Sequence, residues 1–149
     1  MLKATSEERL LQMQYSSQAE HTNRSNVLDM NNKELGLFGE EIAAHFYEEK
    51  HCKILKRNYR TSFGEADIIA VDKDELVFCE VKTRIGADLI EPEEAVDSHK
   101  QEIYKKIASS FHTDSYPVNS YRFDVIAISI HNNSEGSLRH IKHAFYFDE

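Results

Sequence analysis

Two short apolar segments joined by a charged turn constrain this chain more than any other feature. The segments are Asp67–Val71 and Leu76–Lys82, both rich in β-branched or aromatic residues, and all four residues between them are charged. This pattern predicts a β-hairpin. Because side chains two residues apart on a strand share a face, Glu80 and Lys82 lie on the same side of the second strand.

Three charged side chains stand at the ends of these strands: Asp67 begins the first, and Glu80 and Lys82 end the second. Two carboxylates from adjacent strands can hold a hard divalent cation through their oxygen atoms. A lysine beside them can stabilise developing negative charge or orient a water molecule. These groups suit metal-assisted hydrolysis of a phosphodiester. The same residues also suit a salt-bridge network at a sheet edge, and the residues alone leave both interpretations open.

The motifs around these residues resemble a known family. Gly64–Ala70 (GEADIIA), Val77–Arg84 (VFCEVKTR) and the upstream Gly36–Ala43 (GLFGEEIA) are similar to the motifs of the YraN-like family of small bacterial proteins. That family belongs to the restriction-endonuclease-like, PD-(D/E)XK nuclease superfamily. The resemblance covers about residues 33–147 and leaves residues 1–31 without a counterpart.

The resemblance implies an α/β fold with a restriction-endonuclease-like αβββαβ core, in which helices flank a mixed sheet of about five strands. It also implies a divalent-metal nuclease site. In this interpretation Asp67 and Glu80 bind Mg²⁺ or Mn²⁺, with the Val81 carbonyl as a further oxygen ligand. Lys82 positions or activates the attacking water and stabilises the charge of the pentacovalent phosphorus.

Helical periodicity predicts a first helix that begins at Asn31 or Asn32 and ends near Lys50. Its apolar stripe leaves Glu40 and Glu41 on opposite flanks, and the periodicity does not choose between them. The resemblance selects Glu40 as the acid that faces the site, where it completes the metal shell directly or through water.

The second half of the core is predicted as a helix followed by two strands. Ser98 with Gln101 forms a capping-box pattern, and the helix that it starts ends near His112. Tyr121–Ile130 is predicted as a central strand parallel to the second hairpin strand, reached by a crossover connection. Leu138–Phe145 is predicted as a last strand at the edge of the sheet.

Basic side chains gather on the predicted first core strand, Cys52–Thr61. Four of them occur within eight residues that contain no acid: Lys53, Lys56, Arg57 and Arg60. This cluster could follow a phosphate backbone, or it could be a solvated strand face. Arg84 continues the face of Glu80 and Lys82 and is predicted to contact phosphate. Lys100 either reaches a phosphate as well or is an ordinary surface lysine.

Residues 1–31 are predicted as a polar N-terminal extension, separate from a nuclease-like domain over residues 32–149. Serine, asparagine, glutamine and glutamate dominate the extension. Its few apolar residues predict a short amphipathic helix over about residues 6–18, followed by a linker.

Composition bounds the expected function. The net charge of −8 differs from that of a general DNA-coating protein, which is usually basic. No apolar run approaches the roughly 20 residues that span a bilayer, and the N-terminus lacks a signal-peptide core, so we expect a cytoplasmic protein without a membrane partner.

We therefore expect a metal-dependent endonuclease that acts on DNA, with branched or otherwise structured DNA as the favoured substrate. The alternative is a catalytically silent module that binds nucleic acid or docks a partner through a nuclease-like fold. The acidic balance and the small size favour an accessory role or a homodimer.

Overall fold

The structure is a computed structural model that describes residues 5–12, 27–86 and 90–146. A short 3-10 helix over Val27–Asp29 precedes the first α-helix. The helices and strands are, in chain order, β1 (Thr5–Gln12), α1 (Asn32–Glu49), β2 (Lys53–Arg60), β3 (Glu65–Asp72), β4 (Glu75–Ile85), α2 (Pro92–Ala95), α3 (Ser98–Ser110), β5 (Ser120–Ile130) and β6 (Glu135–Phe145).

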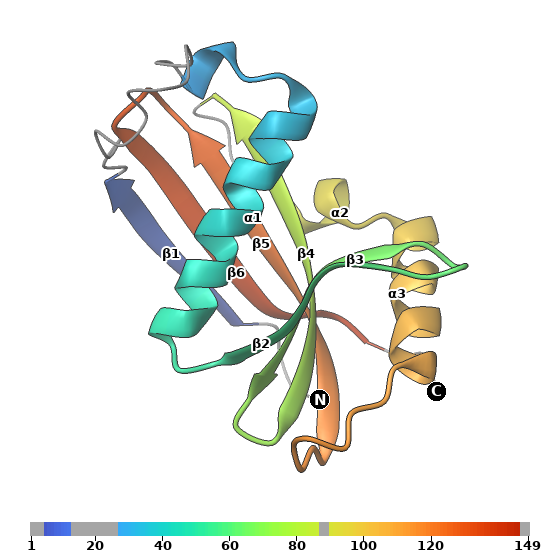
Figure 1. Cartoon of the computed structure of the whole chain (residues 1–149). Coiled ribbons are helices and arrows are strands. Elements are labelled where there is room, and N and C mark those ends of the chain that lie inside the picture. The colour runs from blue at the N-terminus through green and yellow to red at the C-terminus, as the bar shows by residue number, and fades with distance from the viewer. Residues whose placement is uncertain (1–4, 13–26, 87–89, 147–149) are drawn as a thin grey trace.

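The strands form one mixed six-stranded sheet in the order β1-β6-β5-β4-β3-β2. β4 and β5 are parallel, and every other neighbouring pair is antiparallel. Helix α1 lies across one face of the sheet, and α3 lies on the other (Figure 1). The order α1-β2-β3-β4-α3-β5 confirms the predicted α/β fold with its αβββαβ core, and the sheet is one strand larger than expected.

The alternation of side chains along the central strands builds two apolar layers. On β4, Val77 and Cys79 pack toward α1, whereas Leu76 and Phe78 pack toward α3. All four are buried, which explains why this strand is apolar on both faces. Glu80 is therefore the position at which a strand buried on both faces becomes polar on its α3 side.

The predicted hairpin is confirmed, and its open end is splayed. The antiparallel ladder of β3 and β4 runs from Asp72↔Glu75 to Ile68↔Cys79. Beyond it β3 and β2 bend away from the sheet, and the turn between them reaches over α3 (Figure 1). Gly64 in this turn has φ +150° and lies so close to α3 that an added Cβ would be 2.6 Å from Ile103 Cγ2.

The N-terminal segment differs from its prediction. Residues 6–12 belong to strand β1, so the predicted helix over 6–18 is wrong for these residues, and residues 13–18 and the linker lie outside the described residues. β1 pairs antiparallel with β6 along its whole length, so β6 is not the edge strand that was predicted. The open edge of β6 offers β1 backbone hydrogen bonds that an isolated eight-residue helix could not match.

β1 is also held by charge. Arg9 Nη1 donates to Glu49 Oε2 at 2.7 Å, and Lys50 Nζ donates to Glu7 Oε1 at 3.0 Å, both across to the end of α1. Strand β1 of the predicted N-terminal extension therefore shares one sheet with the strands of the predicted domain over residues 32–149.

The cap of α1 agrees with its prediction, and the cap of α3 does not. Asn31 caps α1, where its side chain accepts from the Glu34 N–H at 2.9 Å. The predicted Ser98 cap is wrong by one residue: Asp97 caps α3 and accepts from the Lys100 N–H at 2.9 Å. A carboxylate one residue upstream of a serine suits the electropositive start of the helix better. Among the described residues, no helix is long and apolar enough to cross a membrane.

Gly39 allows α1 to approach β4 closely. A Cβ added at Gly39 would lie 1.7 Å from Thr83 Oγ1 and 2.8 Å from Thr83 Cβ. One turn earlier, no described atom lies within 4 Å of a Cβ added at Gly36. Gly39 thus sets the distance between α1, which carries Glu40, and β4, which carries Glu80.

We expect Gly39→Ala to lower the free energy of unfolding by about 1–3 kcal/mol, because the new methyl group must displace Thr83 or the helix. Gly36→Ala is the matched control on the same helix. It should leave the free energy of unfolding unchanged or raise it by up to about 1 kcal/mol, because alanine favours helix. Urea unfolding followed by circular dichroism compares them, and equal effects would contradict the close contact.

Candidate metal and nucleic-acid site

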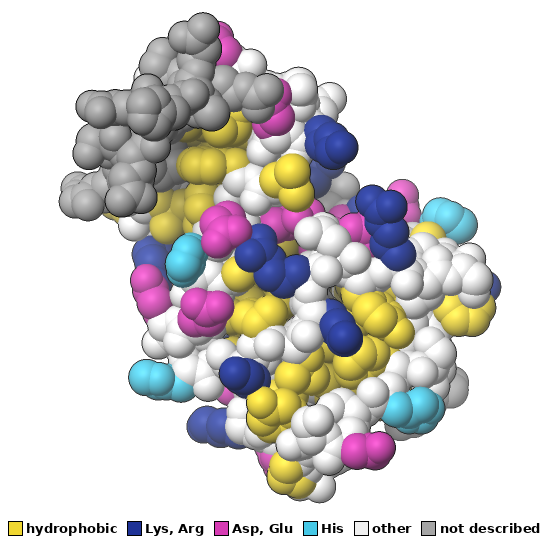
Figure 2. All heavy atoms as spheres, viewed as in Figure 1, with side chains coloured by type: hydrophobic (Ala, Val, Ile, Leu, Met, Phe, Trp, Pro, Cys, Tyr) yellow, Lys and Arg dark blue, Asp and Glu magenta, His cyan; other side chains and the backbone are white. Residues whose placement is uncertain are grey.

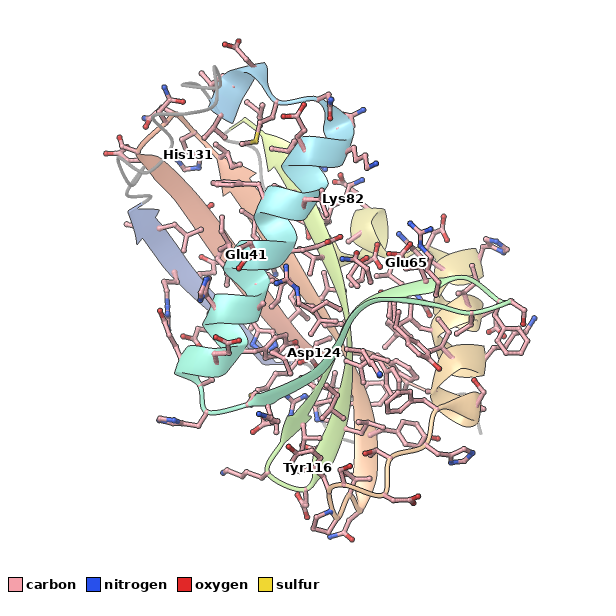
Figure 3. The ribbon with its side chains drawn as sticks, viewed as in Figure 1. Glu41, Glu65, Lys82, Tyr116, Asp124 and His131 are labelled. Atoms are coloured by element: carbon pink, nitrogen blue, oxygen red, sulfur yellow. The ribbon has the colours of Figure 1, made fainter. Side chains whose placement is uncertain are left out.

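The acids predicted to bind metal meet at one cavity. It has a volume of about 690 Å³, and its walls include Glu40 of α1, Asp67 of β3, and Glu80, Lys82 and Arg84 of β4. The wall residues come from the first half of α1, from β3 at the splayed end of the hairpin and from the end of β4, where Figure 3 labels Lys82.

The splay of the hairpin places Asp67. Asp67 lies one residue beyond the last β3–β4 pair, Ile68↔Cys79, where the two backbones no longer bond to each other. Its Oδ2 instead accepts from the Val81 N–H at 2.8 Å. A carboxylate thus takes the place of a backbone acceptor, which fixes Asp67 beside Glu80. Because the N–H and C=O of one strand residue point to the same side, the Val81 carbonyl also points to the β3 side of β4.

Helix α3 holds Glu80 through side-chain contacts that were only partly predicted. The Tyr104 hydroxyl lies 2.5 Å from Glu80 Oε2 and 3.2 Å from the Cys79 carbonyl, and it accepts from the Asp67 N–H at 3.3 Å. Lys100 Nζ pairs with Glu80 Oε1. Tyr104 was missed by sequence reasoning; the available signal was a tyrosine next to the apolar stripe of the helix, since a buried hydroxyl requires a polar partner.

Glu40 and Glu41 are separated by the helix as expected. Glu40 lines the cavity, and its Oε2 is buried without a hydrogen-bond partner among the described residues. Glu41 is exposed and pairs with Arg57 Nη2 at 2.9 Å. The structure therefore places at the site the acid that the family resemblance selected.

The cavity raises the pKa of Asp67 and of Glu40. Burial is the main cause that raises the pKa of Asp67 to about 8, the nearby Glu80 carboxylate adds to it, and the Val81 N–H opposes it. Burial likewise raises the pKa of Glu40, against a hydrogen bond with Asn58. Burial lowers the pKa of Lys100, but the Glu80 carboxylate outweighs it and the net shift is upward. Without a bound cation, the site thus disfavours the ionised form of Asp67.

The donor set fits a hard divalent cation. Among the residues that the structure describes, no three His, Cys, Asp or Glu side chains stand close enough to bind a metal ion by themselves. If a cation bound here, Asp67 and Glu80 would supply two carboxylates, the Val81 carbonyl would supply a third oxygen, and water would link Glu40 to the ion. Mg²⁺ typically keeps several waters and takes one or two carboxylates, so this partial shell suits it.

The predicted phosphate contacts do not all gather at the cavity. Arg84 lines it and pairs with Glu94 of α2. Arg57 and Arg60 are exposed on β2, away from the cavity walls, and Arg60 Nε lies 3.5 Å from Glu65 Oε2. Figure 2 shows Lys and Arg side chains of this face interspersed with Asp and Glu.

The β2 arginines give a measurable prediction. If both contact phosphates, replacing Arg57 and Arg60 by alanine should flatten the log–log salt dependence of duplex binding by about 1.8, because each contact contributes about 0.9. Binding titrations over a range of KCl concentrations measure this slope. An unchanged slope would mean that the two arginines only pair with Glu41 and Glu65.

The fold and the side-chain set define an α/β protein with a restriction-endonuclease-like core and an acidic cavity at its splayed hairpin. Residues 39–128 match the model of the uncharacterised protein family UPF0102, and the chain belongs to that family. This confirms the family that the sequence motifs predicted.

The matches to three relatives in this family cover nearly the full length of each relative. A UPF0102 protein of Clostridium botulinum is 44% identical over 121 residues, which cover 76% of this chain and 95% of the relative. A UPF0102 protein of Rhodococcus jostii is 40% identical over 115 residues, covering 76% and 98%. One of Caldanaerobacter subterraneus is 39% identical over 115 residues, covering 76% and 93%.

Proposed function

We propose that this protein is a metal-dependent endonuclease that acts on DNA, with branched or otherwise structured DNA as its favoured substrate. The observation that carries the proposal is the convergence of Asp67, Glu80 and Glu40 on one cavity, with Lys82 on its wall. Acids that serve only an ion network would be matched by cations. Here Glu40 Oε2 has no partner among the described residues, and the pKa of Asp67 is raised to about 8.

The residues divide the chemistry as follows. Asp67 and Glu80 hold Mg²⁺ or Mn²⁺, which when bound polarises a phosphoryl oxygen and lowers the pKa of water. The Val81 N–H and the Tyr104 hydroxyl keep the two carboxylates in place. Lys82 stabilises the negative charge that develops on the phosphoryl group, and its exposed position allows it to reach a substrate.

The second candidate function is a module that binds nucleic acid or a partner without turnover. The net charge of −8 favours the partner-docking form of this module, because an acidic surface binds DNA weakly. The same charge and the small size favour an accessory role or a homodimer. In either case we place the protein in the cytoplasm, where DNA and Mg²⁺ occur together.

Incubation of the purified protein with branched, flapped and linear DNA, with Mn²⁺ or with EDTA, tests the proposal. We expect cleavage with Mn²⁺ and none with EDTA. An absence of cleavage on every substrate with Mn²⁺ and with Mg²⁺ would overturn the enzyme in favour of the binding module.

A further inference from the structure

Both carboxylate oxygens of Glu80 are already engaged by α3. Tyr104 lies 2.5 Å from Oε2, and Lys100 Nζ pairs with Oε1. The Glu80 side chain is only 5% exposed, so little else can approach it except through the cavity. Each carboxylate oxygen has a second lone pair. A divalent cation on Glu80 would nevertheless be repelled by an ammonium at the same carboxylate, so the metal ion and Lys100 compete for Glu80.

Lys100 is the partner that can leave. Tyr104 is buried, and its hydroxyl also bonds to the backbone of Asp67 and Cys79. The Lys100 side chain is 43% exposed and ends a flexible stem. Its backbone N–H is fixed by the Asp97 cap, so the ammonium can swing away while the helix stays in place.

The Lys100 ammonium would remain close to the site after it leaves Glu80. Lys100 sits in the first turn of α3, directly beside the acid that it releases. Its pairing neutralises one carboxylate in a cavity that holds three, and a divalent cation would take over that role with a larger charge. Among the described residues, Lys100 forms its ion pair with Glu80, and Asp67 and Asp97 are further acids that interact with its charge. A phosphate bound at the cavity would give the freed ammonium a new anionic partner.

We propose that Lys100 and the divalent cation exchange at Glu80 Oε1, and that the displaced Lys100 ammonium then binds a phosphate of the nucleic-acid substrate. This inference rests on the proposed metal site. It couples the two ligands: metal binding creates a phosphate contact that the metal-free protein lacks. Metal and DNA should therefore strengthen each other's binding.

The first test is calorimetry with Mn²⁺ on Lys100→Gln. Removal of the competing ammonium should tighten Mn²⁺ binding about two- to fivefold, the range expected for a half-exposed ion pair. Lys106→Gln is the matched control, because Lys106 lies on the same helix but stacks 5.9 Å from the Phe63 ring centroid. It should leave Mn²⁺ affinity unchanged. Unchanged or weaker binding in Lys100→Gln would overturn the exchange.

The second test separates exchange from simple repulsion. The salt dependence of duplex DNA binding is measured with Ca²⁺, which takes the same oxygen ligands, and with EDTA. Lys100→Gln should flatten the slope by about 0.9 with Ca²⁺ and leave it unchanged with EDTA. An equal effect in both conditions, or none in either, would overturn the inference. If the wild type binds neither Mn²⁺ nor Ca²⁺, the proposed metal site itself fails, which is a different result.

Discussion

Replacing Lys82 by alanine is expected to slow DNA cleavage strongly while leaving metal binding intact. Lys82 is exposed on the wall of the cavity, two residues beyond Glu80 on β4. Its charge matters most when negative charge develops on the phosphoryl group, so its loss should act on the transition state rather than on the bound substrate. By analogy with the loss of one oxyanion-stabilising group, we expect the cleavage rate to fall by about 10²–10³.

Single-turnover cleavage rates and Mn²⁺ calorimetry on the same preparations make this measurement. Lys73→Ala is the matched control: Lys73 is an exposed lysine in the turn at the other end of the hairpin. It should cleave at the wild-type rate. A Lys82→Ala protein that cleaves like the wild type would remove Lys82 from the chemistry, whatever the fate of the metal site.

Asp67→Asn is expected to have the largest effect on metal binding. Asp67 is one of the two carboxylates that the hairpin places together, and its amide analogue carries no charge. Loss of an outer-shell partner typically costs 10–100-fold in metal affinity, so loss of a direct ligand should weaken Mn²⁺ binding by more than about 100-fold. Asp114→Asn, at an exposed acid outside the cavity walls, should bind as the wild type does. Equal Mn²⁺ binding by wild type and Asp67→Asn would exclude Asp67 from the site.

The same variant should be more stable than the wild type at high pH. The pKa of Asp67 is raised from 3.8 to about 8 by burial and by Glu80. Its protonated form is therefore favoured in the folded state, and the associated stability is fully present below pH 3.8 and is lost as the pH rises to about 8. Urea unfolding in EDTA should show the advantage of Asp67→Asn growing from pH 4 to about pH 8. An advantage that does not change with pH would contradict this role of burial.

Local patterns predicted the hairpin and the central strand because each depends on neighbours in the sequence. The apolar, β-branched or aromatic character of Asp67–Val71 and Leu76–Lys82 sufficed for β3 and β4. The β-branched segment Tyr121–Ile130 sufficed for β5, although it also contains polar residues. The acids of the site could be predicted for the same reason, since two of them lie on one hairpin.

Contacts between residues that lie far apart in the sequence could not be predicted from local patterns. β1 forms because β6 leaves an open edge, and the paired residues lie 123 (Gln12↔Glu135) to 137 (Thr5↔Lys142) positions apart in the sequence. Nothing within residues 5–12 indicates that edge. The Tyr104 contact with Glu80 depends on how α3 docks onto the sheet. The sequence allowed two interpretations of Lys100, a phosphate contact or an ordinary surface lysine, and neither included its pairing with Glu80.

Anomalous diffraction from crystals soaked in Mn²⁺ tests the central claim most directly. The account predicts one strong peak in the cavity, about 2.1 Å from carboxylate oxygens of Asp67 and Glu80, with the Lys100 ammonium moved away from Glu80. Crystals of Asp67→Asn should lack this peak under the same soak. A peak elsewhere, or an empty cavity at Mn²⁺ concentrations that support cleavage, would contradict the assignment of Asp67 and Glu80 as the metal ligands.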